Sequence, residues 1–305
     1  MADAFLTTSE VAKFNDSDLD IGILSEVLNN APVLSALAAK SIAGVTYNYL
    51  KETAAPNVGF RSENAGRENS VGSYTKVGVD LKILDASYYL DIAVAEADER
   101  GASAALATQA VSHLRAAMFH AEKEIINGAE TGGFGGFADQ ISALSDAMCV
   151  NAGGTTADTA SSVYAVVSSP SEVSVVWGQS GEINVGDTVV QKHDASTGSY
   201  PVYYTPISAY CGLQVGTDYS LGAIRNLTED SSAKLTDDMI ADLLSKFPSG
   251  VRPSMLVMNR RSLAQLRDSR VASHPTGAPV NFPADSFGVP IVVSDGVIST
   301  EALIS

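Results

Sequence analysis

The stretch Ala102–Asn127, ASAALATQAVSHLRAAMFHAEKEIIN, determines how the rest of the chain is interpreted. Its apolar residues recur at steps of three and four, which is the spacing of one face of an α-helix. They are Leu106, Ala110, Leu114, Met118, Ala121 and Ile125. Gly128 follows directly, and glycine commonly ends a helix because it adopts the left-handed conformation without strain. The pattern predicts a single helix roughly 39 Å long, placed between two β-rich regions.

The composition describes a folded protein and excludes several classes. Hydrophobic residues make up 45% and charged residues 18% of the 305 residues, a balance that excludes a chain disordered throughout. No apolar run approaches the roughly 20 residues that cross a membrane, and the N-terminus shows no signal-peptide pattern. The net charge is −16, without a basic segment of the kind that binds phosphate backbones. We therefore expect no membrane association and no tight nucleic-acid binding.

Residues 1–44 are expected to form an N-terminal arm. The first residues are polar with scattered apolar anchors, and a short helix is predicted after Asp18, which can cap it. Pro32 interrupts this helix. An arm this thin cannot bury its own apolar face, so it needs the body of the protein or a neighbouring molecule.

Residues 45–95 predict a long hairpin. Val45–Leu50 and Tyr74–Leu84 alternate between apolar and polar residues, as strands do. The loop between them contains glycine and proline and has a mixed charge. Two strands alone are marginally stable in water, and long loops are usually functional or disordered. We expect another molecule to cover the hairpin.

The region after the helix predicts strands and then a small α/β unit. A glycine-rich turn at 132–136 and a short helix over Gln140–Met148 come first. The predicted strands are Val163–Val167, Val173–Trp177, Asp187–Gln191, Tyr200–Thr205 and Tyr219–Leu227. The final part predicts a helix over Asp237–Lys246 capped by Thr236 and a helix over Arg260–Arg270 capped by Asn259. The strands Ser254–Met258 and Val289–Ser294 alternate with these helices.

The polar residues of the long helix do not suggest a catalytic site. His113 and His120 are seven residues apart and could share a helix face with Glu124. Zinc ligands on a helix are normally three or four residues apart, and no third strong ligand is nearby. Packing or subunit contact is the favoured interpretation. Asp98-Glu99-Arg100 is interpreted as a solvated charged junction, because paired catalytic carboxylates need a placement that sequence cannot show.

Two glycine-containing motifs and two cysteines also fail as functional sites. Gly132–Gly136 follows a helix and lacks the lysine of a phosphate loop. Gly178–Gly181 lacks the second glycine of a nucleophile elbow, since Glu182 occupies that position. Cys149 and Cys211 lack CxxC spacing and are predicted to be buried and reduced. We expect no cofactor and no metal, and the absence of a catalytic group favours a structural protein.

The order of these parts resembles the major capsid proteins of tailed bacteriophages with the Hong Kong 97-type fold (HK-97 fold). Asn57-Val-Gly-Phe-Arg61-Ser-Glu63-Asn64-Ala-Gly66 resembles the aromatic-Arg-x-x-Asn-x-Gly start of the family's extended hairpin. Glu122–Gly128 with Gly132-Gly133-Phe134 resembles the end of its spine helix. Segments of 162–178 and 210–227 resemble strands of its peripheral domain. Thr236–Arg270 and Phe287–Asp295 resemble its axial domain.

The resemblance implies an α+β fold in four parts. These are an N-terminal arm (1–44), an extended β-hairpin or E-loop (45–95), a spine helix with a β-rich peripheral domain (96–228), and an α/β axial domain (229–305). The hairpin and arm would lie over neighbouring subunits. The candidate inter-subunit contacts are Arg61, Glu63, Asn64, Arg67, Glu68, Lys76 and Lys82. Some family members form Lys–Asn crosslinks through the hairpin, but no matching catalytic acid is evident here, so no crosslink is predicted.

The implied function is that of a virion shell subunit. Copies would form pentamers and hexamers of an icosahedral shell that encloses double-stranded DNA without sequence-specific binding. Assembly is expected in the host cytoplasm with separate scaffolding and portal proteins, and a decoration protein is a further candidate partner. Two alternatives stay open: an encapsulin-like compartment that carries enzyme cargo, and a soluble enzyme with a β-rich substrate domain.

Overall fold

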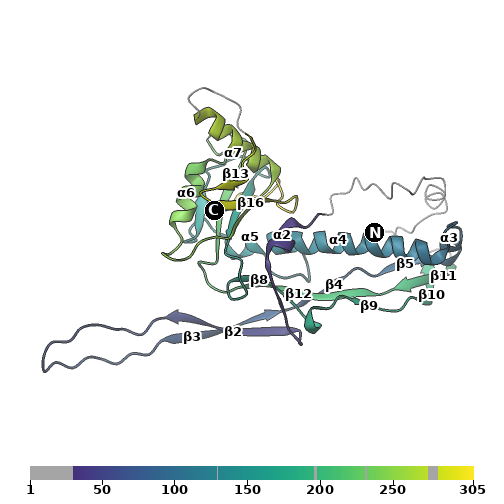
Figure 1. The fold of residues 1–305 in the computed structure, drawn as a ribbon, viewed down its shortest axis with the longest axis horizontal. Helices are drawn as coiled ribbons and strands as arrows, with labels where there is room; N and C mark the ends of the chain where they lie inside the picture. Colours follow the sequence, from purple (N-terminus) through teal and green to yellow (C-terminus); the bar gives the residue numbers. More distant parts are fainter. Residues whose placement is uncertain (1–29, 129, 196–197, 231, 274–280) are drawn as a thin grey trace.

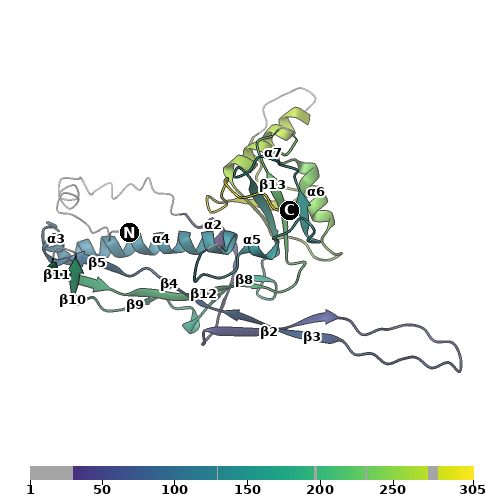
Figure 2. The same ribbon diagram turned by 180° about the vertical axis from the view of Figure 1, so that it is seen from behind.

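A computed structural model describes residues 30–128, 130–195, 198–230, 232–273 and 281–305. The molecule is elongated, with a sheet-containing domain at one end of a long helix and a hairpin that projects away from both (Figure 1, Figure 2). The helix predicted after Asp18 lies outside the described residues.

The long helix α4, Ala102–Asn127, has the predicted bounds. Gly128 is left-handed with φ 62°, and its N–H donates to the carbonyl oxygen of Glu124, which ends the helix as predicted. Ala121 and Ile125 are buried, while the earlier members of the apolar stripe are half-buried. The helix therefore packs most tightly at its C-terminal end.

A six-stranded sheet forms the domain at that end of α4. Its order is β15-β16-β14-β7-β13-β6, and it carries the larger part of the hydrophobic core. The strands are β6 (Cys149–Asn151), β7 (Ser161–Val166), β13 (Leu221–Leu227), β14 (Met255–Met258), β15 (Asp285–Ser286) and β16 (Val289–Val293). The helices α6 (Asp237–Ser245) and α7 (Arg260–Ser273) belong to the same domain. Because β7 pairs with both β13 and β14, this sheet includes strands from both sides of residue 228.

Two further sheets lie along α4 (Figure 1). One has the order β1-β8-β12-β4, with β9 added at β12, and the other has the order β10-β11-β5. Their strands are β1 (Ala38–Ser41), β4 (Lys82–Asp85), β5 (Tyr88–Asp91), β8 (Val173–Trp177), β9 (Asn184–Val185), β10 (Val189–Ala195), β11 (Gly198–Thr205) and β12 (Ile207–Val215). A small second core of Leu90, Val94, Ala95 and Ala105 joins β5 and the short helix α3 (Ile92–Glu96) to α4.

Three local predictions need correction. The helix expected over Gln140–Met148 is wrong, because α5 covers only Phe137–Gln140 and turns follow it. The strand expected over Tyr74–Leu84 is two strands that meet at Leu81. The strand β12 begins at Ile207, three residues before the segment that starts at residue 210 and resembles a strand of the family. The predicted caps are confirmed: Thr236 accepts from the Met239 N–H at 3.3 Å, and Asn259 accepts from the Ser262 N–H at 2.8 Å.

Within the described ranges, no helix combines the length and the apolar character that a membrane span requires.

Candidate functional site

The hairpin consists of β2 (Thr46–Ala54) and β3 (Ser73–Asp80), paired antiparallel from Thr46↔Asp80 to Ala54↔Ser73. One face carries Tyr47 and Val79, which are half-buried against the body of the protein. The opposite face and the connecting loop 55–72 are exposed almost throughout. The ribbon shows this loop at the far end of the hairpin, away from the rest of the chain (Figure 1).

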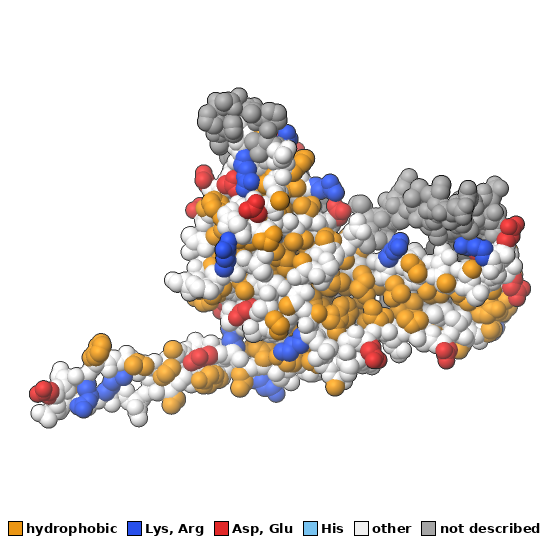
Figure 3. Space-filling view, in the orientation of Figure 1, with side chains coloured by type: hydrophobic (Ala, Val, Ile, Leu, Met, Phe, Trp, Pro, Cys, Tyr) orange, Lys and Arg blue, Asp and Glu red, His pale blue; other side chains and the backbone are white. Residues whose placement is uncertain are grey.

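Large hydrophobic side chains are exposed along this hairpin. Leu50 is 72% exposed and Phe60, in the loop, is fully exposed. Hydrophobic, basic and acidic side chains occur together at the free end of the hairpin (Figure 3). The exposed set is Leu50, Val58, Phe60, Val71 and Tyr74. Contiguous exposed apolar surface marks an interaction site in a soluble protein.

The structure brings five of the seven candidate contact residues together in the loop. Arg61 donates to the Ala65 carbonyl at 3.4 Å, and Arg67 donates to the carbonyl of Asn57. Asn64 has φ 60° and turns the chain at the tip. Across the described residues, none of the four charged side chains of the loop takes part in an ion pair. Their charges therefore remain available to another molecule.

The base of the hairpin is fixed to the body by specific contacts. Tyr49 donates its hydroxyl to the Val215 carbonyl at 2.6 Å, and the Lys51 ammonium lies 2.6 Å from the Asp218 carboxylate. Burial raises the pKa of Tyr49, so this phenol stays protonated and continues to donate. These contacts join β2 to the end of β12 and hold the direction of the hairpin.

Leu81 explains why the predicted long strand divides. Its N–H donates to the Val45 carbonyl and closes the hairpin, and its side chain is buried over two glycines. A Cβ atom on Gly178 or Gly212 would lie 2.9 or 2.8 Å from a methyl carbon of Leu81. Beyond Leu81 the chain pairs with β12 as β4, so Lys82 lies in the body of the protein, whereas Lys76 lies exposed on β3.

The histidine and carboxylate group of α4 does not form a common site. His113 is half-buried and stacks on Tyr88 with ring centroids 5.0 Å apart. His120 contacts Glu130. Glu124 is buried, and one of its oxygens accepts from the Glu130 N–H at 3.3 Å. In the described part of the chain, no cluster of His, Cys, Asp and Glu could hold a metal ion.

The charged junction and the cysteines also have structural surroundings. The expectation of a solvated junction is wrong for Asp98, which is 4% exposed. Its carboxylate accepts from Arg100 Nε at 3.0 Å and Nη2 at 2.8 Å, and these hydrogen bonds lower the pKa of Asp98. Cys149 and Cys211 are buried and free, as predicted, and burial raises the pKa of the Cys211 thiol to about 11.

One buried carboxylate that the sequence analysis missed fixes the start of the described chain. Glu122 on α4 is fully buried and accepts from the Val33 and Leu34 N–H groups at 2.7 and 2.9 Å, in the short helix α2 (Pro32–Ala36). It also accepts from Ser294 after β16. The signal was available in the sequence, because Glu122 is four residues after Met118 and three before Ile125, within the buried face of the helix.

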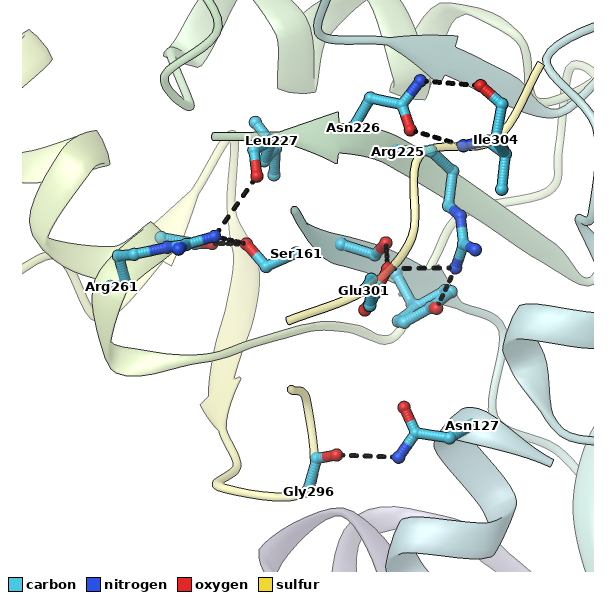
Figure 4. A network of polar contacts seen from close by, with 12 residues as sticks. Asn127, Ser161, Arg225, Asn226, Leu227, Arg261, Gly296, Glu301 and Ile304 are labelled. Carbon is cyan, nitrogen blue, oxygen red and sulfur yellow. Dashed lines mark hydrogen bonds and ion pairs between the residues drawn. The ribbon is translucent and has the colours of Figure 1, made fainter. Parts of the chain in front are cut away.

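A second missed group lies beneath the C-terminal residues. Arg225 on β13 and Glu301 are both nearly buried, with Arg225 Nη1 3.5 Å from Glu301 Oε2. Two hydroxyl groups complete the cluster. Arg225 donates to the Tyr164 hydroxyl at 2.5 Å, and the Ser162 hydroxyl donates to the Glu301 carboxylate at 2.5 Å. Figure 4 shows Arg225 and Glu301 of this group near Asn226, which forms two hydrogen bonds with the backbone of Ile304. These contacts hold the C-terminal segment on the six-stranded sheet.

Comparison with known families identifies the fold that carries this hairpin. The family described as major capsid protein GP7 matches residues 21–304. The chain belongs to the major capsid protein GP7 family. No curated protein matches the chain in sequence.

Solved capsid structures share the architecture of this capsid protein. A chain of bacteriophage epsilon15 superposes with a TM-score of 0.70 at 17% identity, over 100% of this chain and 98% of that chain. A chain of the bacteriophage JBD30 capsid superposes with a TM-score of 0.52 at 12% identity, over 96% and 99%. The expected HK-97-type fold is confirmed, and the role of the protein is that of a structural capsid component.

Proposed function

We propose that copies of this protein form pentamers and hexamers, which close into an icosahedral shell around double-stranded DNA, and that it has no enzymatic activity. The observation that carries this proposal is the hairpin, whose apolar side chains and loop charges have no cover in the described chain. A surface of this kind needs a second molecule. Many modest contacts between copies, each used repeatedly, add up to a stable closed assembly.

The net negative charge supports a shell that does not bind its DNA tightly. The net charge of −16 disfavours direct phosphate binding. A shell protein with a net negative charge is compatible with DNA that a separate motor packages into the shell. The proposal accordingly assigns scaffolding, portal and decoration functions to other proteins, and it places assembly in the host cytoplasm. Arg61, Glu63, Asn64, Arg67, Glu68, Lys76 and Lys82 remain proposed contact residues between subunits.

The decisive experiment is electron microscopy of the purified protein after size-exclusion chromatography, with and without its scaffolding protein. We expect closed shells or rings of five and six subunits. A control chain in which residues 55–72 are replaced by Asn-Gly should stay folded and fail to assemble. A wild-type chain that remains monomeric with its scaffold present would contradict the proposal.

The contents of native particles separate a virion from a cargo compartment. Nuclease-protected DNA in particles purified from the native source is the expected result. An enclosed enzyme that copurifies in fixed ratio, without protected DNA, would instead support a cellular compartment with the same fold.

A further inference from the structure

A small pocket lies beside the base of the hairpin. Its volume is about 260 Å³, and it lies between the turns after α5 and the turn that connects β12 to β13. The buried side chains of Ile141, Met148 and Leu221 line it, and Asp146 and Asp218 add two carboxylates. Ligand pockets usually measure about 300–1,000 Å³. This one is instead sized for a single large side chain that is flanked by positive charge.

The end of the hairpin offers a side chain with those properties. Phe60 is fully exposed, and the next residue is Arg61. Arg67 lies on the same part of the loop, because it donates to the Asn57 carbonyl and its Nε lies 4.0 Å from a Cβ placed on Gly59. The aromatic ring matches the apolar lining of the pocket, and the two guanidinium groups match the Asp146 carboxylate, because Asp218 is already paired with Lys51 of its own chain. Aromatic and arginine side chains are the usual anchors of protein interfaces.

The length of the hairpin determines which copy can be reached. Lys51 contacts Asp218 at the pocket, and nine further residues of extended chain place Phe60 roughly 30 Å away. The loop that carries Phe60 lies at the free end of the hairpin, away from the rest of its own chain (Figure 1). A tip that binds the base region of the next copy makes a head-to-tail contact, and contacts of this type close into rings when the rotation permits.

We propose that Phe60 of one copy occupies this pocket in the next copy, with Arg61 and Arg67 beside the Asp146 carboxylate. The inference rests on the proposed function, since it names the docking site of the hairpin. A second pocket of about 450 Å³ is a poorer match, because none of the residues that line it has a buried hydrophobic side chain. That pocket, which also includes Ser35, provides a matched control.

Cysteine crosslinking tests the contact directly. In F60C/T217C the new thiols would lie at the tip and at the pocket, while Cys149 and Cys211 are buried and contribute little background. Mild oxidation of assembled F60C/T217C should give a ladder of disulfide-linked oligomers on non-reducing gels. The control F60C/S35C and each single variant should give at most monomers and dimers. Shells of F60C/T217C without a ladder would overturn the pairing and leave the proposed function intact.

A second measurement removes the dependence on disulfide geometry. F60A should raise the protein concentration needed for assembly at least roughly tenfold, the effect of losing an anchoring aromatic side chain. V190A, on β10 and 63% exposed, should leave that concentration nearly unchanged. Equal effects of F60A and V190A would overturn the pairing. Crosslinking of T217C to a copurified scaffolding or decoration protein would assign the pocket to that partner and also overturn it.

Discussion

The six-stranded sheet and the hairpin bury their strands to opposite extents. β7 and β13 are buried at every residue, whereas the residues of β3 are either exposed or half-buried. Their polar groups differ in the same way: Arg225 and Glu301 pair inside the domain, and the charges of the hairpin loop do not pair in the described chain. The strands of the sheet are covered by their own chain, whereas the hairpin has no such cover in the described residues. Four predictions test this difference, in order of decreasing effect.

The largest effect should come from breaking the buried pair of the domain. R225M leaves the Glu301 carboxylate buried without its cation, which typically costs about 3–5 kcal/mol of unfolding free energy. Chemical denaturation of dissociated subunits measures this loss. The double variant R225M/E301L removes both charges and should recover most of it. A loss below about 1 kcal/mol in R225M would show that the pair is not structurally important.

The next effect concerns the junction between the two regions. In G212A the added methyl would lie 2.8 Å from a methyl carbon of Leu81 and 3.2 Å from Val79. Such overpacking costs about 1–3 kcal/mol and should shift the base of the hairpin. Denaturation measures the loss, and electron microscopy should show fewer closed shells. G212A should cost less stability in an L81A background than in the wild type, because the shorter side chain leaves room for the added methyl group. An equal cost in both backgrounds would contradict this packing account.

A smaller effect concerns the pH dependence of the domain and of the end of α4. Burial raises the pKa of Glu122, Glu124 and Glu301. Each carboxyl then binds its proton more tightly in the folded chain than in the unfolded chain. Their contribution to the free energy of unfolding is therefore complete at pH values below 4.5, the ordinary pKa of a glutamate carboxyl. It falls as the pH rises from there toward the raised pKa of the folded state.

Replacing one of these groups should flatten that dependence. E124Q removes one titrating proton, and a single proton accounts for at most about 1.4 kcal/mol per pH unit. Urea denaturation at several values from pH 4.5 to 8 should give a smaller decrease in stability for E124Q than for the wild type. E63Q, in the exposed loop, is the control and should follow the wild type. Identical slopes for E124Q and the wild type would contradict the assignment.

The smallest effect on stability should come from the hairpin itself. Leu50 is 72% exposed, and L50S should change the unfolding free energy of the dissociated subunit by no more than about 0.5 kcal/mol. Shell formation should nevertheless decrease, because that apolar surface would be buried only between copies. Denaturation and electron microscopy of the same preparation check both parts. A large loss of subunit stability would show that the hairpin packs on its own chain.

Features that depend on neighbouring residues could be predicted from the amino-acid sequence alone. The bounds of α4, its end at Gly128 and the cap at Thr236 follow from helix spacing and from side chains within a few positions of each backbone group. The strand β8 was predicted with its observed bounds for the same reason. The charged tip of the hairpin was also predictable, because its residues are consecutive.

Features that depend on residues far apart in the chain could be seen only in the folded protein. The strand predicted through Leu81 divides because that side chain packs over Gly178 and Gly212, which lie far away in the sequence. Likewise, β7 joins β14 through pairing that crosses the expected domain boundary. Glu122 is buried because Val33 and Ser294 approach it from opposite ends of the chain. Alternation and composition specify which face a residue occupies, but the partner that covers that face is set by packing of the whole chain.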